Sequence, residues 1–173
     1  MLTKNFTLLE TAVIAKRTGN GGFVPEYVIN TDGNRVTPVN NYSMMTDLNA
    51  LFNITNKTVS ELDITANVGT FAFGTGTSEV TKSDFDLESA ISDTNFSIES
   101  ATRQFNEDRT TLNQQIKYSG SDEITITELG YFYNYGTSNG SSVYYFPILI
   151  AREKIEPIKV KQNDIFQVSM IIG

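Results

Sequence analysis

The sequence predicts an all-β, mostly antiparallel protein: a single β-sandwich or jelly-roll-like domain with an irregular N-terminal segment and one or two short helices. From residue 58 onward, about seven segments are rich in β-branched and aromatic residues, and short runs of turn-forming residues separate them. Several of these segments alternate apolar and polar residues, as half-buried strands do. The chain has 173 residues, 39% of them hydrophobic, which is enough for one domain with a real core.

Residues 1–57 are the less regular part of the chain, and we expect them to form an arm or a small subdomain. Apolar residues flank the sequence TDGN at 31–34. Asp-Gly between two such runs predicts a hairpin, because Gly33 tolerates a positive φ. Residues 47–52 (DLNALF) are predicted to be a short helix.

The β-sandwich domain is expected over residues 58–173. A first strand-like run ends at Gly74 and Gly76, glycines that suit a turn with positive φ. Residues 83–91 (SDFDLESAI) are predicted to be a short helix or helical turn. A flexible loop is expected at 134–142 and a turn at 155–164, and Pro147 indicates an edge position or a bulge in its strand. The remaining strand-like segments are 96–102, 111–118, 123–134, 142–153 and 164–173.

The composition excludes several function classes. The chain has no Cys and no His, so it lacks thiolate chemistry, the usual proton shuttle at neutral pH and the commonest transition-metal ligand. A net charge of −7 disfavours binding to nucleic acids and to anionic membranes. The first ten residues do not have the pattern of a secretory signal. We therefore expect a non-enzymatic protein without a cofactor and without a small-molecule ligand.

Three local patterns invite a chemical interpretation, and a simpler one is favoured for each. The run FGTGTSEV at 73–80 is glycine-rich but lacks the residues of a nucleotide loop, which favours a tight turn. The acidic stretch of Asp84, Asp86, Glu88 and Asp93 suggests calcium, but its spacing favours a solvated helix face. A glycosidase would need a carboxylate pair, for which Glu123 and Glu128 are the natural candidates. Only their acidity singles them out, which favours a solvent-facing Glu123 and a partly buried Glu128 among strand residues.

Tyrosines gather around the expected 134–142 loop. A sugar-binding platform is one interpretation, and a core combined with a subunit interface is the favoured one. The candidate interface residues are Tyr131, Tyr133, Tyr135, Tyr144 and Tyr145.

Glu128 and Arg152 are the charged residues embedded in the two most apolar segments. A buried charge without a partner is costly, so we expect the two side chains to pair across adjacent strands on one sheet face. Gly130 is expected to leave room on its strand for a neighbouring aromatic ring or backbone.

An ordered set of short motifs runs through the C-terminal two thirds of the chain. It comprises GTGT at 74–77, D-x-x-L at 84–87 with Ile91 downstream, TELGYF at 127–132, Ala-Arg at 151–152 and PIKV at 157–160. This order resembles a pattern in small bacteriophage structural proteins of the tail, baseplate or fibre region. The resemblance covers residues from about 68 to 173.

The resemblance implies a virion component that assembles as an oligomer in the host bacterial cytoplasm. Its implied partners are other copies of itself and other virion proteins of the tail, neck or fibre-attachment region. The N-terminal segment and the tyrosine-rich loop are the expected contact regions. The alternatives are a capsid decoration or head-fibre protein, a receptor- or carbohydrate-binding module, and, least favoured, a glycosidase that works with carboxylates alone.

Overall fold

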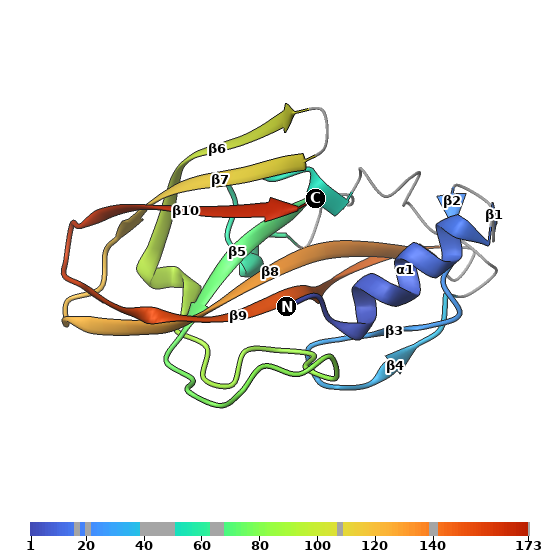
Figure 1. Cartoon of the computed structure of the whole chain (residues 1–173), viewed down its shortest axis with the longest axis horizontal. Helices are drawn as coiled ribbons and strands as arrows, with labels where there is room; N and C mark the ends of the chain where they lie inside the picture. The colour runs from blue at the N-terminus through green and yellow to red at the C-terminus, as the bar shows by residue number, and fades with distance from the viewer. Residues whose placement is uncertain are drawn as a thin grey trace.

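The computed structural model describes residues 1–15, 18–19, 22–38, 51–62, 68–106, 109–138 and 142–172. Two three-stranded antiparallel sheets dominate it, with strand orders β5-β8-β9 and β10-β7-β6 (Figure 1). The six strands are β5 (Gly69–Gly74), β6 (Phe96–Asn106), β7 (Arg109–Tyr118), β8 (Ile124–Ser138), β9 (Val143–Val160) and β10 (Ile165–Ile172). The predicted all-β, mostly antiparallel, sandwich-like fold is confirmed.

The core lies between the two large sheets. In β7 the residues Leu112, Ile116 and Tyr118 are buried and alternate with more exposed polar residues, as the period-2 pattern predicts. Aromatic rings from both sheets meet in this core. Phe73 of β5 lies with its ring centroid 4.9 Å from that of Phe96 and 5.4 Å from that of Phe166.

Strands β8 and β9 are longer than the sequence predicts. The flexible loop expected at 134–142 is wrong for residues 134–138, because β8 continues to Ser138. Residues 139–141 lie outside the described residues, and β9 begins at Val143. The cross-strand ladder and the contact between the Tyr135 and Phe146 rings, with centroids 5.8 Å apart, extend the pairing through turn-forming residues. Pro147 lies in β9, at the edge of its sheet, as expected.

The turn expected at 155–164 is shorter than predicted. Strand β9 runs on to Val160, and the chain reverses at residues 161–164. The backbone N–H of Lys161 donates to the Asp164 carboxylate, and Asn163 adopts a φ of 71°, a conformation that Asn tolerates better than most residues.

The N-terminal segment contains a helix that the sequence interpretation missed. Helix α1 (Lys4–Ile14) buries Asn5, Leu9 and Ala12, which are spaced as one helical face. The predicted hairpin is confirmed: β3 (Val28–Ile29) pairs with β4 (Arg35–Val36) around Gly33, whose φ is +78°. The other short elements are β1 (Thr18–Gly19), β2 (Gly22–Phe23), and the 3₁₀ turns η3 (Val59–Glu61) and η4 (Asp93–Asn95).

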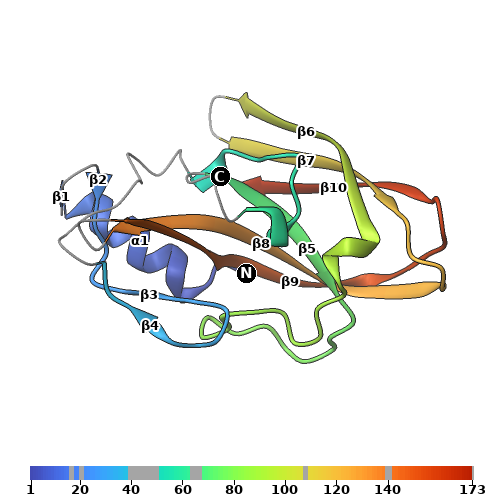
Figure 2. The same ribbon diagram turned by 180° about the vertical axis from the view of Figure 1, so that it is seen from behind.

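Side-chain and backbone contacts fix the N-terminal segment on β9. The Thr3 hydroxyl and the Asn5 side chain donate to Leu149 O of β9 at 2.7 and 3.2 Å. Asn5 also joins α1 to β3, because its side chain donates to Ile29 O and accepts from Ile29 N at 2.8 and 2.7 Å. Leu2 bridges to Ala151. Residues on both sides of the boundary predicted at residue 57, including Leu9 and Leu112, share one hydrophobic cluster. Figure 2 shows α1 and the β3–β4 hairpin from behind, beside β8 and β9.

Part of the expected structure lies outside the described residues. The helix predicted at 47–52 does so except for Leu51 and Phe52, which are buried. The strand predicted before Gly74 is described from residue 68 on, and it contains β5. In the described ranges no helix is long and apolar enough to cross a bilayer.

Candidate functional site: a buried ionic cluster

The candidate site is centred on the charged pair predicted from the sequence, Glu128 and Arg152. Glu128 of β8 and Arg152 of β9 are 1% and 4% exposed. Arg152 donates from Nε to Glu128 Oε2 at 2.8 Å, and its second guanidinium nitrogen also lies 2.8 Å from that oxygen. Because Gly130 is directly opposite Arg152, the two charged residues are diagonal neighbours on one face of the sheet. The expected carboxylate–guanidinium contact is confirmed.

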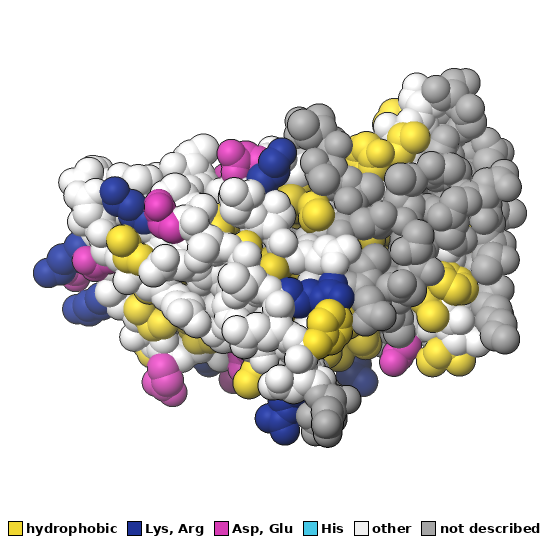
Figure 3. All heavy atoms as spheres, turned by 90° about the horizontal axis from the view of Figure 1, so that it is seen from above, with side chains coloured by type: hydrophobic (Ala, Val, Ile, Leu, Met, Phe, Trp, Pro, Cys, Tyr) yellow, Lys and Arg dark blue, Asp and Glu magenta, His cyan; other side chains and the backbone are white. Residues whose placement is uncertain are grey.

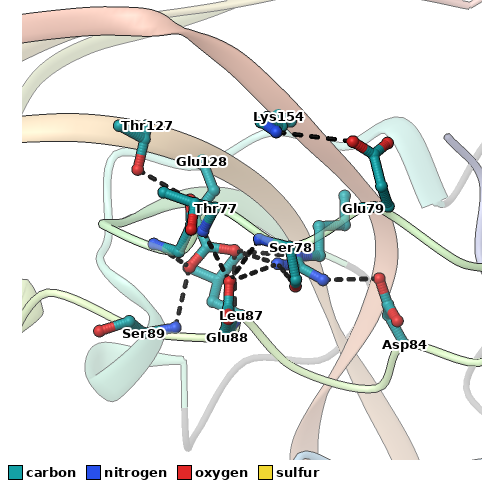
Figure 4. Close-up of polar contacts among 12 residues, drawn as sticks. Thr77, Ser78, Glu79, Asp84, Leu87, Glu88, Ser89, Thr127, Glu128 and Lys154 are labelled. Carbon is teal, nitrogen blue, oxygen red and sulfur yellow. Dashed lines mark hydrogen bonds and ion pairs between the residues drawn. The ribbon is translucent and has the colours of Figure 1, made fainter.

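Backbone groups complete the coordination of the Glu128 carboxylate. The N–H groups of Gly76 and Ser89 donate to Oε1 at 3.1 and 2.9 Å, and the N–H of Glu88 donates to Oε2 at 3.2 Å (Figure 4). Charge-assisted hydrogen bonds of this kind are stronger than neutral ones. They offset the cost of burying the carboxylate.

Arg152 is in turn surrounded by further acceptors. It donates to Asp84 Oδ2 at 2.8 Å, and its guanidinium lies 3.7 Å from Glu88 Oε2 and 3.4 Å from Ser78 Oγ. Three carboxylates therefore share one guanidinium. We call Asp84, Glu88, Glu128 and Arg152 the ionic cluster.

The glycine-rich run at 73–80 is an anion-binding loop whose anion is supplied by the protein itself. The Gly76 N–H faces Glu128, and the N–H groups of Thr77 and Ser78 donate to Glu88 Oε2 at 2.6 and 2.8 Å. Successive N–H groups that converge on one oxygen form the kind of nest that elsewhere holds phosphate. Here the protein's own carboxylates fill it, which agrees with the sequence interpretation against a nucleotide site.

The conformational role expected for Gly74 and Gly76 is wrong. Among the described glycines only Gly33 has a positive φ, so neither residue needs glycine for its backbone angles. Glycine is required at both positions because a side chain would collide with the neighbouring carboxylates. A Cβ on Gly74 would overlap the Glu128 carboxylate, and one on Gly76 would lie 2.6 Å from both Glu128 Oε1 and Glu88 Oε2. Gly130 does leave room for neighbours, because its Cβ would lie 2.9 Å from Leu87 and Phe132.

The helix predicted over 83–91 is also wrong, because the segment consists of turns and a single bridge from Ala90 to Gly74. Its side chains and backbone are committed to the ionic cluster instead. The Glu88 and Ser89 N–H groups donate to Glu128 rather than to helical carbonyls. In the segment's interior, Leu87 packs with Phe132 and Leu149 on the outer face of β8 and β9.

Asp84 and Glu88 are the cluster members that the sequence interpretation assigned to other roles. It placed them in a solvated helix face or a calcium site. The acidic residues Asp84, Asp86 and Glu88 recur at every second position, which is the spacing of an extended chain rather than of a helix face. That spacing is the signal that could have identified them. In the described part of the chain, no group of three or more acidic, His or Cys residues could hold a metal ion.

Hydrogen bonds shift the pKa values of the outer carboxylates. Partial burial acts to raise the pKa of Asp84, but hydrogen bonds from Thr81 and Arg152 lower it overall. Backbone and side-chain hydrogen bonds from Ser78 lower the pKa of Glu88. Burial acts to lower the pKa of Arg152, and its bonds to Asp84 and Glu128 raise it overall. The contribution of Asp84 to stability is therefore present above its ordinary pKa and is lost as the pH falls through the lowered value.

Asp86 behaves in the opposite way, and this gives a pH-dependent prediction. Burial raises its pKa, and the charges of Glu128 and Asp32 raise it further. The destabilisation by ionised Asp86 is thus absent below its ordinary pKa and complete above the raised value. Asp86→Asn keeps an acceptor for the Leu87 N–H and should raise the thermal midpoint at pH 7 by about 1–3 °C. Thermal unfolding followed by circular dichroism measures this shift.

The control for Asp86→Asn is Glu79→Gln, an acid-to-amide change at a side chain that is 92% exposed. Glu79→Gln should leave the thermal midpoint unchanged at pH 7 and at pH 3. The gain from Asp86→Asn should vanish near pH 3, where Asp86 is protonated in the native chain. A gain of equal size at both pH values would contradict the electrostatic explanation.

The tyrosines predicted as an interface are divided by the structure. Tyr131, Tyr133 and Tyr135 are at most 1% exposed, so their assignment to a surface is wrong. They point into the core from β8, a central strand whose residues 131–137 are buried on both faces. At the far end of β9, Tyr144 is 50% exposed and Tyr145 is half-buried.

The second carboxylate proposed for glycosidase chemistry is engaged elsewhere. Glu123 lies 3.9 Å from the ammonium group of Lys159 and 3.4 Å from that of Lys161. Glu128 accepts hydrogen bonds on both oxygens from Arg152 and three backbone N–H groups. The Glu128 carboxylate is therefore surrounded by the Arg152 guanidinium and backbone donors, and it does not lie beside Glu123.

Comparisons with protein-family models, with curated proteins and with solved structures find no match to this chain. The site geometry therefore carries the functional argument. The arrangement fastens an external segment, residues 75–91, to the β5-β8-β9 sheet through buried charges.

Proposed function

We propose that this chain is a structural, non-enzymatic subunit of a bacteriophage virion. It belongs to the tail, neck or fibre-attachment region and acts by assembling with copies of itself and with other virion proteins. The proposal rests on the ordered motifs and on where their residues lie in the fold.

The convergence of the motifs on one cluster carries the proposal. The Gly-Thr-Gly-Thr and Thr-Glu motifs meet through Glu128 and through Thr127, whose hydroxyl donates to Gly76 O at 2.8 Å. The D-x-x-L motif contributes Asp84 and the Ala-Arg motif contributes Arg152, and these two residues form an ion pair. Four separated segments that resemble phage structural proteins thus form one structural unit.

The chemistry of this unit suits a framework protein. The charges of the ionic cluster are directed at one another and at backbone N–H groups. They hold residues 75–91 against the sheet, where Phe85 covers Gly33 of the β3–β4 hairpin. A surface segment held in this way can present a fixed shape to a neighbouring subunit.

A receptor- or carbohydrate-binding module is the less favoured function. A sugar platform needs exposed aromatic rings, and three of the five candidate tyrosines are buried. Tyr144 is the exposed one. Glycan-array binding that is lost in Tyr144→Ala would favour this alternative.

The decisive experiment localises the chain in purified particles of the phage that encodes it. Mass spectrometry should detect it in stoichiometric amounts, and a cryo-EM map of the intact particle should show its density in the tail, neck or fibre-attachment region. Density on the capsid surface would support a decoration or head-fibre protein instead. Absence from washed particles, with the chain present in the infected-cell lysate, would overturn the proposal.

A further inference from the structure

Strand β10 forms an edge of its sheet and differs from the other edge strands. Among the described residues it pairs with β7 alone. Its eight residues, IFQVSMII, include no charge and no proline, and its pairing with β7 runs without a register shift. A long, regular, uncharged edge strand is a template for pairing with another chain.

The other three edges carry the protections that β10 lacks within the described chain. Strand β9 is bridged by Leu2 and contains two prolines. Strand β5 forms isolated β-bridges at both ends, from Gly69 to Ile54 and from Gly74 to Ala90. Strand β6 contains charged residues and a register shift after Ile98. Charges, proline, bulges and covering segments are the usual means by which edge strands avoid association.

The inner face of β10 is incompletely covered. Phe166, Val168, Met170 and Ile172 point toward the core but are only half-buried, whereas inward residues of β7 such as Leu112 and Ile116 are 0% exposed. A groove of about 440 Å³ lies along β10 between the two sheets. Its lining is mostly apolar, with Phe73, Ile126, Phe166 and Val168 among others, and it also includes Glu153 and Glu156 of β9. Figure 1 shows β10 beside β7, on the side of β7 that lies away from β6. An additional strand beside β10 would cover this apolar surface.

The outer face of β10 is self-complementary. Its four exposed residues read Ile165, Gln167, Ser169, Ile171, and the two isoleucines are 57% and 64% exposed. In an antiparallel pair of two β10 strands centred on Val168, Ile165 lies opposite Ile171 of the second copy, and Gln167 lies opposite its Ser169. Apolar residues then face apolar residues and polar face polar, as favourable cross-strand pairs require.

We infer that β10 is a homodimerisation edge, where a second copy of this chain pairs antiparallel across a two-fold axis. The two β10-β7-β6 sheets join into one continuous sheet of six strands. A two-fold contact uses the same surface on both subunits, and the palindromic pattern of β10 meets that condition. Figure 3 shows the face on the β6 and β7 side: uncharged surface covers most of its described part, and charged side chains of both signs are scattered over it. The inference rests on the proposed function, which includes self-assembly, and it identifies a second copy of this chain as the partner of β10.

The test places like charges on the pairing edge. Gln167→Lys/Ser169→Lys puts a lysine opposite a lysine twice in the dimer, at side chains that are exposed in the single chain. Sedimentation velocity of the full chain over a concentration series should show a dimer, and the double variant should raise its dissociation constant about tenfold or more. The matched control is Thr102→Lys/Gln104→Lys, which adds the same charges to exposed positions of β6, the opposite edge of the sheet. It should dimerise like the native chain.

Charge reversal supplies the positive arm of the experiment. A Gln167→Glu/Ser169→Glu variant should be monomeric by itself and should form a heterodimer when mixed with the lysine variant, since each lysine then meets a glutamate. A native chain that stays monomeric at all concentrations overturns the inference. An oligomer that is equally stable in the β10 and β6 variants also overturns the inference. Self-assembly would then use a surface other than β10. Localisation in the particle decides the proposed function independently of either result.

Discussion

Arg152→Met should destabilise the fold by about 3–5 kcal/mol, because it leaves buried Glu128 without its cation. Removing one partner of a buried ion pair costs this much in general, since the remaining charge is neither solvated nor paired. Here the loss is aggravated by Asp84 and Glu88, which would face Glu128 without the guanidinium between them. Urea denaturation followed by fluorescence or circular dichroism measures the difference in the free energy of unfolding.

Two further variants separate the buried charge from a general effect of substitution. Lys154→Met removes the cation that lies 3.6 Å from Glu79, at a contact whose side chains are 46% and 92% exposed. Exposed pairs contribute little, so this control should change stability by less than about 1 kcal/mol. Adding Glu128→Gln to Arg152→Met should recover part of the loss, because the amide keeps an acceptor for the Gly76 and Ser89 N–H groups. Equal losses from Arg152→Met and Lys154→Met would contradict the assignment of the ionic cluster as a determinant of stability.

The Glu128–Arg152 pair shows which part of the site the sequence could predict. Both residues interrupt strongly apolar segments, and a charge in that position must find a partner. The every-second-position spacing of the acids at 84, 86 and 88 indicates an extended segment, but it does not identify Arg152 as their partner. Asp84 and Glu88 reach Arg152 only because residues 75–91 fold back along the sheet, and no local pattern encodes that path.

The strands illustrate the same limit at the level of the fold. Alternation predicted β7 well, because one of its faces is buried and the other carries exposed polar residues. The β8 tyrosines were expected at an interface because they flank a predicted loop, but residues 131–137 are buried on both faces. Turn-forming residues near 134–138 suggested a loop, and cross-strand pairing with β9 overrides that preference. Helix α1 could have been found from the spacing of Leu9 and Ala12.

Gly74→Ala should destabilise the fold by about 3 kcal/mol, an effect that the backbone angles of Gly74 do not predict. Gly74 lies directly opposite Glu128 in the β5–β8 ladder, and an added Cβ would occupy the space of the Glu128 carboxylate. Overpacking of this kind costs about 1–3 kcal/mol. Displacing the carboxylate also weakens the hydrogen bonds from the Gly76 and Ser89 N–H groups. Chemical denaturation of the purified variant measures the loss.

The origin of that loss can be isolated by removing the obstructing group. In a Glu128→Ala/Arg152→Met background neither buried charge remains, and the space beside Gly74 is open. Adding Gly74→Ala to this background should cost less than about 1 kcal/mol, so the two sites should be strongly coupled. If Gly74→Ala costs the same in both backgrounds, then backbone conformation rather than the carboxylate determines the need for glycine. Coupling of the expected size would mean that the glycine-rich loop is specified by the anion it encloses, as a phosphate loop is, with Glu128 in place of the phosphate.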